Sequence, residues 1–204
     1  MTAMDAPTPP LEPRLYVVRH GQTESSARHA YSGHADVPLT PVGRDQARRA
    51  GERLAGAGVE LIVSSPLSRA RDTAAAIAAA TGAPMQVDER LTEVDYGPFE
   101  GLDRDGARAR FGPAFAAWRE DPFGAPVPGM EPLGDALARA RLATADVLAA
   151  ARRPVVVGHQ GILRLVLVAL GWIAPADYFS TRLHEADPLV IAHAALAPPD
   201  HESS

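Results

Sequence analysis

Short runs of apolar residues recur along the chain and are separated by longer stretches with different spacing. Runs at 14–18, 61–63 and 154–157 are rich in leucine, isoleucine and valine. They are too short for helices and therefore predict buried strands. Weaker runs at 85–87 and 188–196 predict an edge-like strand and a final strand. Together these runs supply the strands of one sheet.

Several of the intervening stretches carry apolar residues every three or four positions, which is the period of an amphipathic helix. Local signals mark the helix ends. Thr40 is a candidate N-cap with Pro41 at the first helical position, and Ser65 is a second candidate N-cap. Gly82 is expected to end one helix and Gly112 to interrupt another. The predicted helices cover 41–54, 66–80, 104–118, 133–152 and 162–170.

Strands and helices alternate along most of the chain, which predicts an α/β fold. The expected architecture is a mainly parallel sheet with helices on both faces, a three-layer αβα arrangement. A chain of 204 residues suits a single domain, expected over 14–196. The proline-rich residues 1–13 are expected to form a disordered N-terminal tail, and residues 197–204 a C-terminal tail.

Composition narrows the possible chemistry. The net charge of −5 argues against general nucleic-acid binding, which depends on a basic surface. The sequence contains neither lysine nor cysteine, so lysine Schiff bases, phosphate-loop lysines, thiol catalysis and cysteine-ligated metals are excluded. No secretory signal is recognised, and the apolar runs are too short to cross a bilayer. A cytoplasmic protein without a membrane or nucleic-acid partner is expected.

Basic side chains follow the ends of two predicted strands, and another lies at the start of the helix that follows a third strand. Arg19 and His20 follow the first strand, and His159 follows the strand at 154–157. If these two strands are parallel neighbours, both imidazoles emerge at one edge of the sheet, where ligands bind in such folds. Arg69 falls in the first turn of a predicted helix, whose N-terminus already favours anions. These positions predict an anion site.

Each of these residues also has a simpler interpretation. His20 could cap a strand, His159 could be a buried histidine bonded to backbone, and the two arginines could pair with nearby Glu24 or Asp72. A carboxyl group for proton transfer is expected in the acidic loop 91–101. Glu93 is the favoured candidate, and the alternatives left open are Glu89, Asp95 and Glu100.

Taken together, the motifs resemble those of the histidine phosphatase superfamily, also called the phosphoglycerate mutase-like family. The resemblance covers roughly residues 15–171 and depends on five stretches in the same order. They are Arg19-His20-Gly21, Asp36-Val37-Pro38-Leu39-Thr40 with Gly43, Ser65-Pro66-Leu67-Ser68-Arg69-Ala70, Glu93–Gly101, and Gly158-His159-Gln160-Gly161 with Arg164.

The resemblance implies a phosphoryl-transfer pocket in a phosphoglycerate mutase-like fold. His20 would attack phosphorus and become phosphohistidine, while Arg19, Arg69 and His159 would hold the phosphate oxygens. Glu93 would protonate the leaving oxygen and later deprotonate water. The backbone N–H of Gln160 is a further candidate donor. No cofactor and no metal are expected, because the cationic side chains can neutralise a phosphate dianion. The partner would be a small phosphorylated metabolite, and a homodimer is possible.

The chain departs from the family pattern in its outer pocket. Ser26 stands where the family often has a phosphate-contacting asparagine, and its hydroxyl can still donate one hydrogen bond. Ser32 and Gly33 stand where the family has Gln-Gly. The absence of lysine removes a residue that mutases use for the acid end of a phosphoglycerate. A phosphatase is therefore favoured over two alternatives, a phosphoglycerate-type mutase and a non-catalytic phosphate-binding protein.

Other conspicuous residues receive structural interpretations. Trp118 and Trp172 are expected to pack in the core or a lid. No metal-ligand spacing connects the remaining histidines at 29, 34, 184, 193 and 201. The helical arginines at 48, 49, 108, 110, 139 and 141 are expected mostly on solvated faces.

Overall fold

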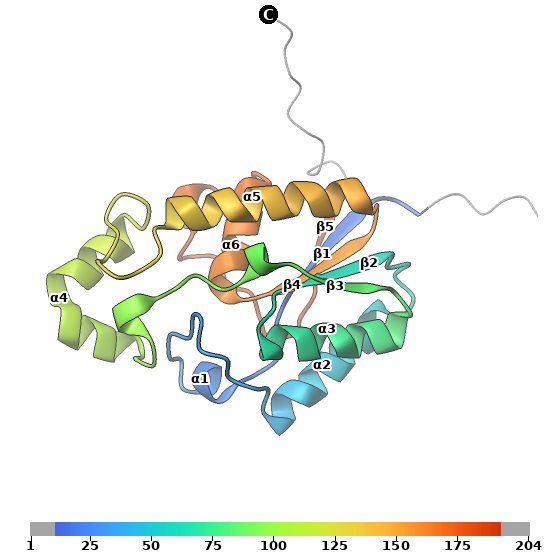
Figure 1. Cartoon of the computed structure of the whole chain (residues 1–204), viewed down its shortest axis with the longest axis horizontal. Helices are drawn as coiled ribbons and strands as arrows, with labels where there is room; N and C mark the ends of the chain where they lie inside the picture. Colours follow the sequence, from blue (N-terminus) through green and yellow to red (C-terminus); the bar gives the residue numbers. More distant parts are fainter. Residues whose placement is uncertain (1–10, 193–204) are drawn as a thin grey trace, which may run out of the picture.

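The computed structural model describes residues 11–192 and contains one five-stranded sheet (Figure 1). The strand order is β3-β2-β4-β1-β5. The first four strands in this order run parallel, and the last is antiparallel to its neighbour. The predicted mainly parallel sheet is therefore confirmed. The strands are β1 (Arg14–Arg19), β2 (Leu61–Ser64), β3 (Met85–Val87), β4 (Pro154–Gly158) and β5 (Leu189–Ala192).

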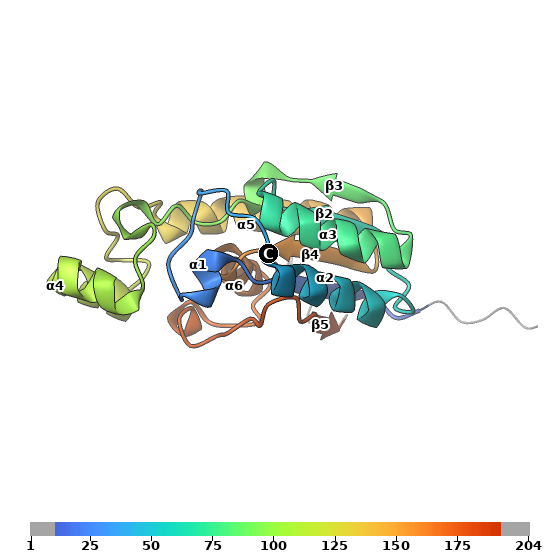
Figure 2. The ribbon, with the colours of Figure 1, turned by 90° about the horizontal axis from the view of Figure 1, so that it is seen from below.

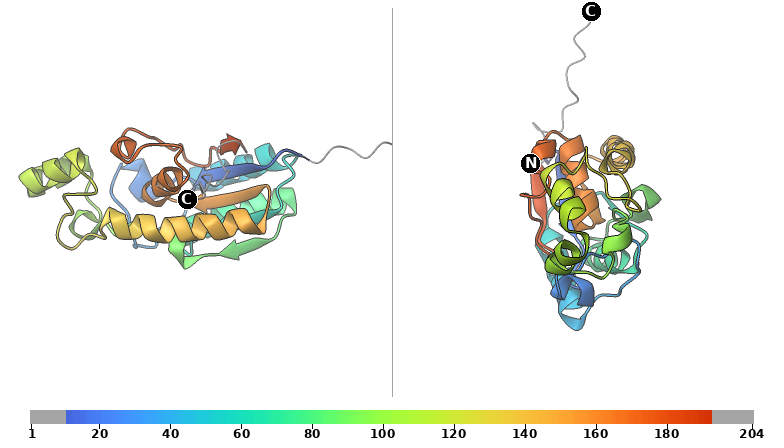
Figure 3. Two further views of the ribbon diagram at one scale, coloured as in Figure 1. Left: turned by 90° about the horizontal axis from the view of Figure 1, so that it is seen from above. Right: turned by 90° about the vertical axis from the view of Figure 1, so that its left-hand side faces the viewer.

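Helices cover both faces of the sheet, as predicted. Figure 1 shows α2 and α3 on one side, with α5 and α6 on the other. The helix α4 extends beyond one end of the sheet, as Figures 2 and 3 show. The helices are α1 (Glu24–Ala27), α2 (Pro41–Leu54), α3 (Ser68–Thr81), α4 (Arg104–Glu120), α5 (Leu133–Ala150) and α6 (Gln160–Ala169), with short 3₁₀ turns at Glu89–Leu91, Gly97–Phe99 and Pro175–Asp177.

The two faces of β1 supply two separate cores. Successive side chains of a strand point to opposite faces. Leu15 and Val17 accordingly join the cluster that includes α5 and α6, whereas Tyr16 and Val18 join the cluster that includes α2 and α3. All four are buried. The continuous apolar run in the sequence is thus explained by burial on both sides.

Two predicted helix ends and one predicted helix interruption are confirmed. The Thr40 hydroxyl accepts from the N–H of Gly43 at 3.0 Å, capping α2. Gly82 ends α3 with φ of 73°, and Gly112 kinks α4 with φ of 29°. The prediction that Ser65 caps the next helix is wrong, because α3 begins at Ser68 and its N-cap makes no side-chain bond. The Ser65 hydroxyl instead lies 2.7 Å from Nε2 of His159.

Some parts of the prediction fall outside the described residues. Residues 1–10 and 193–204 are among them, so most of both expected tails, the end of the final predicted strand and the domain limits stay predictions. The described segment 11–13 has no regular structure, and Arg153 donates to the carbonyl of Glu12 there. Within residues 11–192, no helix combines the length and apolar character needed to cross a membrane.

An aromatic cluster anchors α4 to the rest of the molecule. Trp118 is 1% exposed, and its ring centroid lies 4.8 Å from that of Phe179 and 5.5 Å from that of Phe99. Its predicted packing role is confirmed. Trp172 was expected to pack in the core or in a lid. Packing in the core is wrong, because 44% of the residue is exposed. The contact with Phe179 joins α4 to the segment that follows α6.

Candidate active site

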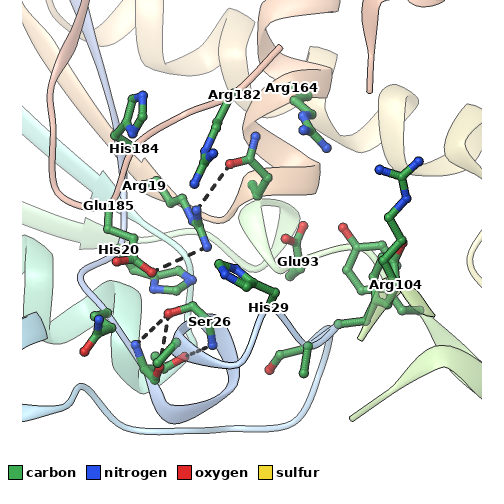
Figure 4. Close-up of a pocket in the computed structure, with 18 of the residues that line it drawn as sticks. Arg19, His20, Ser26, His29, Glu93, Arg104, Arg164, Arg182, His184 and Glu185 are labelled. Atoms are coloured by element: carbon green, nitrogen blue, oxygen red, sulfur yellow. Dashed lines mark hydrogen bonds and ion pairs between the residues drawn. The ribbon is translucent and has the colours of Figure 1, made fainter. Parts of the chain in front are cut away.

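A cavity of about 750 Å³ lies at the carboxyl ends of β1 and β4 (Figure 4). These strands are parallel neighbours, with Arg19 opposite Gly158. The residues after each strand end are His20 and His159, and their ring centroids are 5.1 Å apart. The sequence-based expectation that both imidazoles emerge at one edge of the sheet is therefore confirmed.

His20 lines the cavity and is held in one tautomer. Its Nδ1 lies 2.7 Å from the carbonyl oxygen of Gly21. Because a carbonyl can only accept, Nδ1 carries the proton and Nε2 keeps its lone pair. Burial lowers the pKa of His20 well below its usual 6.5, and the nearby cations of Arg19 and Arg69 lower it further. The ring is therefore neutral and can act as a nucleophile near neutral pH.

Arg69 is almost fully buried, with 1% of the residue exposed. Its Nε donates to Nδ1 of His159 at 3.0 Å, and Nη1 donates to the carbonyl of Ala35 at 2.7 Å. Nη2 donates to the carbonyl of Gly33 at 2.8 Å. Burial lowers the pKa of the guanidinium, although Glu93 opposes that shift. These contacts exclude the surface ion pair with Asp72 and aim a fixed cation at the cavity.

His159 lies behind the cavity wall, because it is 1% exposed and is not among the lining residues. Arg69 donates to its Nδ1, so Nε2 carries the proton and donates to Oγ of Ser65 at 2.7 Å. Burial lowers the pKa of His159 well below 6.5, and Arg69 and His20 add to this effect. Both ring nitrogens already have side-chain partners, so a contact with phosphate requires one of these bonds to be exchanged.

Arg19 lines the cavity beside His20 and is tied to the segment after α6. Its Nη1 donates to Oε1 of Gln160 at 3.4 Å and to the carbonyl of Leu183 at 3.3 Å. Its Nη2 lies 3.7 Å from a carboxylate oxygen of Glu185. Its buried Nε has no partner within residues 11–192. Burial lowers the pKa of Arg19, an effect that Glu185 opposes. The free Nε is a donor available to an anion.

Glu93 also lines the cavity and belongs to the loop between β3 and α4. Its Oε1 accepts from the N–H of Val94 at 2.9 Å and of Ile162 at 2.8 Å, and Oε2 accepts from Gly161 at 2.9 Å. The N–H groups of Gly161 and Ile162 lie in the first turn of α6, where backbone N–H groups have no hydrogen-bond partner within the helix. Oε2 has one donor where Oε1 has two, so Oε2 is the oxygen with room for a proton.

The three other acidic candidates do not line the cavity. Glu100 accepts from the N–H of Gly33 at 2.6 Å, and Asp95 accepts from that of Gly97 at 2.8 Å. Glu89 starts a 3₁₀ turn. The geometry thus favours Glu93 among the candidates for proton transfer.

The outer candidates take different positions. Ser26 lines the cavity, but its hydroxyl donates to the carbonyl of Thr23 at 3.1 Å and accepts the N–H of Thr23 at 2.9 Å, closing the cap of α1. Ser32 also lines the cavity, and its buried hydroxyl lacks a partner within the described chain. Gly33 does not line it. A Cβ there would lie 2.5 Å from the carbonyl of Val94, so Gly33 serves close backbone packing.

Gln160 contributes its side chain as well as its position at the start of α6. Its Oε1 also accepts from the N–H of Leu183 at 3.3 Å, and its Nε2 donates to the carbonyl of Thr181 at 3.3 Å. The side-chain amide thereby links Arg19 to the segment after α6.

Several further basic residues line the outer cavity, and sequence reasoning had not assigned them to the site. Figure 4 labels Arg104, Arg164 and Arg182 in this part of the site, and Arg119 also lines the cavity, which makes four outer arginines. Arg119 stacks on Phe179 at 3.7 Å, and Arg164 donates to the carbonyl of Thr181 at 2.7 Å. None of the four has a carboxylate partner within 4.0 Å in the described part of the chain. The added basic residues are His29, Arg104, Arg119, Arg164, Arg182 and His184.

A metal centre is not formed by the described side chains. Across residues 11–192, no group of three or more histidine, aspartate or glutamate side chains is placed to hold a metal ion. The positive charge at this site comes from arginine.

Comparison with known proteins identifies the family. Residues 15–194 match the model of the histidine phosphatase superfamily, branch 1, and the chain belongs to this superfamily. A glucosyl-3-phosphoglycerate phosphatase of Mycobacterium tuberculosis is 38% identical over 167 residues, which cover 77% of this chain and 74% of the relative. A 2,3-bisphosphoglycerate-dependent phosphoglycerate mutase of a Methylobacterium species is 35% identical over 190 residues, covering 88% and 91%.

A solved structure shows the same fold. A mycobacterial glucosyl-3-phosphoglycerate phosphatase in complex with VO3 superimposes with a TM-score of 0.79 at 34% identity. The match covers 87% of this chain and 90% of that chain. The expected phosphoglycerate mutase-like architecture is thereby confirmed.

Proposed function

We propose that this protein is a phosphatase that hydrolyses small phosphomonoesters through a phosphohistidine at His20. The observation that carries the proposal is the bond from His20 Nδ1 to the carbonyl of Gly21. This bond leaves the lone pair of Nε2 free beside the cations of Arg19 and Arg69. A neutral nitrogen next to fixed positive charge is what attack on a phosphate dianion requires.

The reaction has two steps. Nε2 of His20 bonds to phosphorus while the bond to the ester oxygen breaks, and that oxygen takes a proton from Glu93. A water molecule then attacks the phosphohistidine, Glu93 takes a proton from the water, and inorganic phosphate leaves. The carboxyl group thus ends each cycle protonated, as it began. Arg19, Arg69 and His159 are the proposed stabilisers of the phosphate oxygens, with Gln160, Ser26, Ser32 and Gly33 shaping the surroundings.

The proposed mechanism uses no metal, because arginine forks match the geometry and charge of phosphate. The similarity to a mycobacterial phosphatase solved in complex with VO3, an oxyanion of vanadium that is an analogue of a phosphoryl group, supports the proposal. Treatment with a chelator is therefore expected to leave the rate unchanged. A rate lost to the chelator and restored by a divalent cation would contradict metal independence.

The outer arginines point to a substrate with a second anionic group. Cations without carboxylate partners in a cavity are stabilised by a ligand anion. Two of the relatives above are named for phosphoglycerate compounds, which carry a carboxylate beside the phosphate. A small phosphorylated acid is therefore the proposed substrate class.

A phosphoglycerate-type mutase is the second candidate, favoured by the similarity to the Methylobacterium mutase. Incubation with 3-phosphoglycerate and a bisphosphorylated primer separates the two functions. Free phosphate indicates a phosphatase, whereas isomer without free phosphate indicates a mutase. The proposed compartment is the cytoplasm, and a homodimer stays a prediction.

The experiment that tests the proposal compares wild type with His20→Ala on a generic aryl phosphate and on several sugar phosphates. The variant is expected to lose activity by at least about 1,000-fold, because no other group in the cavity replaces the nucleophile. Its thermal unfolding midpoint shows whether it remains folded. Equal rates for the two proteins would reject the proposal.

A further inference from the structure

Arg139 was expected on a solvated face of its helix, and the structure contradicts this. Its side chain is 20% exposed and points from α5 towards the loop that carries Glu93. All five N–H groups of the Arg139 guanidinium donate hydrogen bonds. They donate to Oε1 and Oε2 of Glu131 at 2.7 and 2.8 Å and to the carbonyls of Arg90, Thr92 and Glu93 at 2.7, 2.6 and 3.3 Å.

Glu131 holds the same loop on the other side of Glu93. Its Oε2 accepts from the N–H of Asp95 at 3.2 Å, and its own N–H donates to the carbonyl of Asp95 at 2.9 Å. The pair of Arg139 and Glu131 therefore fastens the backbone immediately before and after Glu93. A loop without a helix or strand of its own gains a fixed position from these bonds.

This attachment determines where the Glu93 carboxyl group lies. The carboxyl is bonded at its far end to the N–H groups of Gly161 and Ile162 in α6. Its backbone is bonded to Arg139 in α5. Neither Arg139 nor Glu131 lines the cavity. Their hydrogen bonds reach the site only through the backbone of the Glu93 loop, and a lysine at position 139 would keep the positive charge while losing those bonds.

We propose that Arg139, braced by Glu131, is a positioning residue that sets the Glu93 carboxyl at the distance needed for proton transfer to the leaving oxygen. This proposal rests on the proposed phosphatase function. Misplacement of a catalytic group by about 1 Å can cost roughly 100-fold in rate. Lysine cannot replace Arg139, because an ammonium has three donors and no planar fork.

The test compares leaving groups. Glycerol 3-phosphate releases an alkoxide that needs a proton, whereas 2,4-dinitrophenyl phosphate releases a stable phenolate that does not. Cleavage is measured in single turnovers with enzyme in excess, so that hydrolysis of the phosphoenzyme does not intervene. The matched control is Arg141→Lys, two residues along α5 and exposed to solvent.

Arg139→Lys is expected to slow cleavage of glycerol 3-phosphate by about 30-fold or more and of the dinitrophenyl ester by less than about threefold. Glu93→Gln should show the same selectivity, and Arg141→Lys should slow neither substrate. If a folded Arg139→Lys slows both substrates alike, or slows neither, the proposal is overturned. Glu131→Gln is the second variant if Arg139→Lys does not fold, with the same selectivity expected.

A second measurement does not depend on activity. Amide hydrogen exchange at Gly161 and Ile162 reports the bonds to the Glu93 carboxyl. Their exchange should be at least about tenfold faster in Arg139→Lys than in wild type or Arg141→Lys. Unchanged exchange would overturn the positioning role. If wild type cleaves neither ester, the proposed function fails, and the exchange rates alone decide whether Arg139 positions Glu93.

Discussion

The imidazole rings of His20 and His159 lie with their centroids 5.1 Å apart, although one follows the first strand of the sheet and the other follows the fourth in sequence. Parallel pairing of β1 and β4 produces this approach. Arg69 enters from α3 and bonds His159, so three elements meet at one point. Two buried neutral imidazoles beside two guanidiniums form a site prepared for an anion.

The pKa of His20 leads to a prediction about pH. Burial and the cations of Arg19 and Arg69 hold this pKa well below 6.5, so the acid limb of kcat/KM should also lie well below pH 6.5. Arg19→Gln removes one cation and should raise the pKa of His20. Nuclear magnetic resonance titration of the ring measures both effects. Titration of wild-type His20 at or above pH 6.5 would contradict the electrostatic account.

The same two histidines predict how stability depends on pH. The pKa values of His20 and His159 are lowered in the folded state. Below about pH 6.5 the unfolded chain therefore binds protons that the folded chain does not, which favours unfolding. Each histidine should reduce the free energy of unfolding by up to about 1.4 kcal/mol per pH unit below that point. Urea denaturation at several pH values checks this, and His20→Gln should show a shallower slope than wild type.

The outer cavity predicts discrimination between matched substrates. Wild type should hydrolyse 3-phosphoglycerate with kcat/KM at least about tenfold above that for glycerol 3-phosphate, which lacks the carboxylate. Arg119→Gln should remove most of this preference through KM. Arg108→Gln is the control, because it lies on the same helix, is exposed and does not line the cavity. Equal values of kcat/KM for the two substrates in wild type would exclude a role for the second anionic group.

The two tryptophans predict opposite effects on stability. Trp118→Ala should reduce the free energy of unfolding by about 3–5 kcal/mol, since the residue is 1% exposed within an aromatic cluster. Trp172→Ala, at 44% exposure, should change it by less than about 0.5 kcal/mol. Chemical denaturation measures both values. A similar loss in the two variants would show that the cluster does not anchor α4.

Much of the fold could be predicted because its signals are local. The apolar runs of β1, β2 and β4 are buried on both faces, and Thr40 and Gly82 mark helix ends through their own bonds and dihedral angles. The short helix α1 was missed because four residues show no helical period. Its real signal was the reciprocal cap between Thr23 and Ser26, and Ser26 had been interpreted as a phosphate contact.

The site could be predicted only in part, for a related reason. His20 and Arg69 stand at element ends, where local sequence gives their position. Part of the outer wall of the cavity comes from the segment that follows α6, which shows neither helical nor strand periodicity. The N–H of Ala186 donates to the carbonyl of Arg19 at 2.8 Å and holds this segment in place. Arg139 likewise shows ordinary helical spacing, and the backbone carbonyls that it contacts lie 46, 47 and 49 positions earlier in the chain. Tertiary contacts of this kind leave no local pattern.

The most direct measurement is to quench the protein during turnover of a phosphomonoester at alkaline pH and locate the phosphoryl group by mass spectrometry. The account predicts an acid-labile phosphoryl group on His20, bonded to Nε2, and its absence in His20→Ala. Turnover by wild type with no phosphoenzyme, or with the phosphoryl group on another residue, would contradict it.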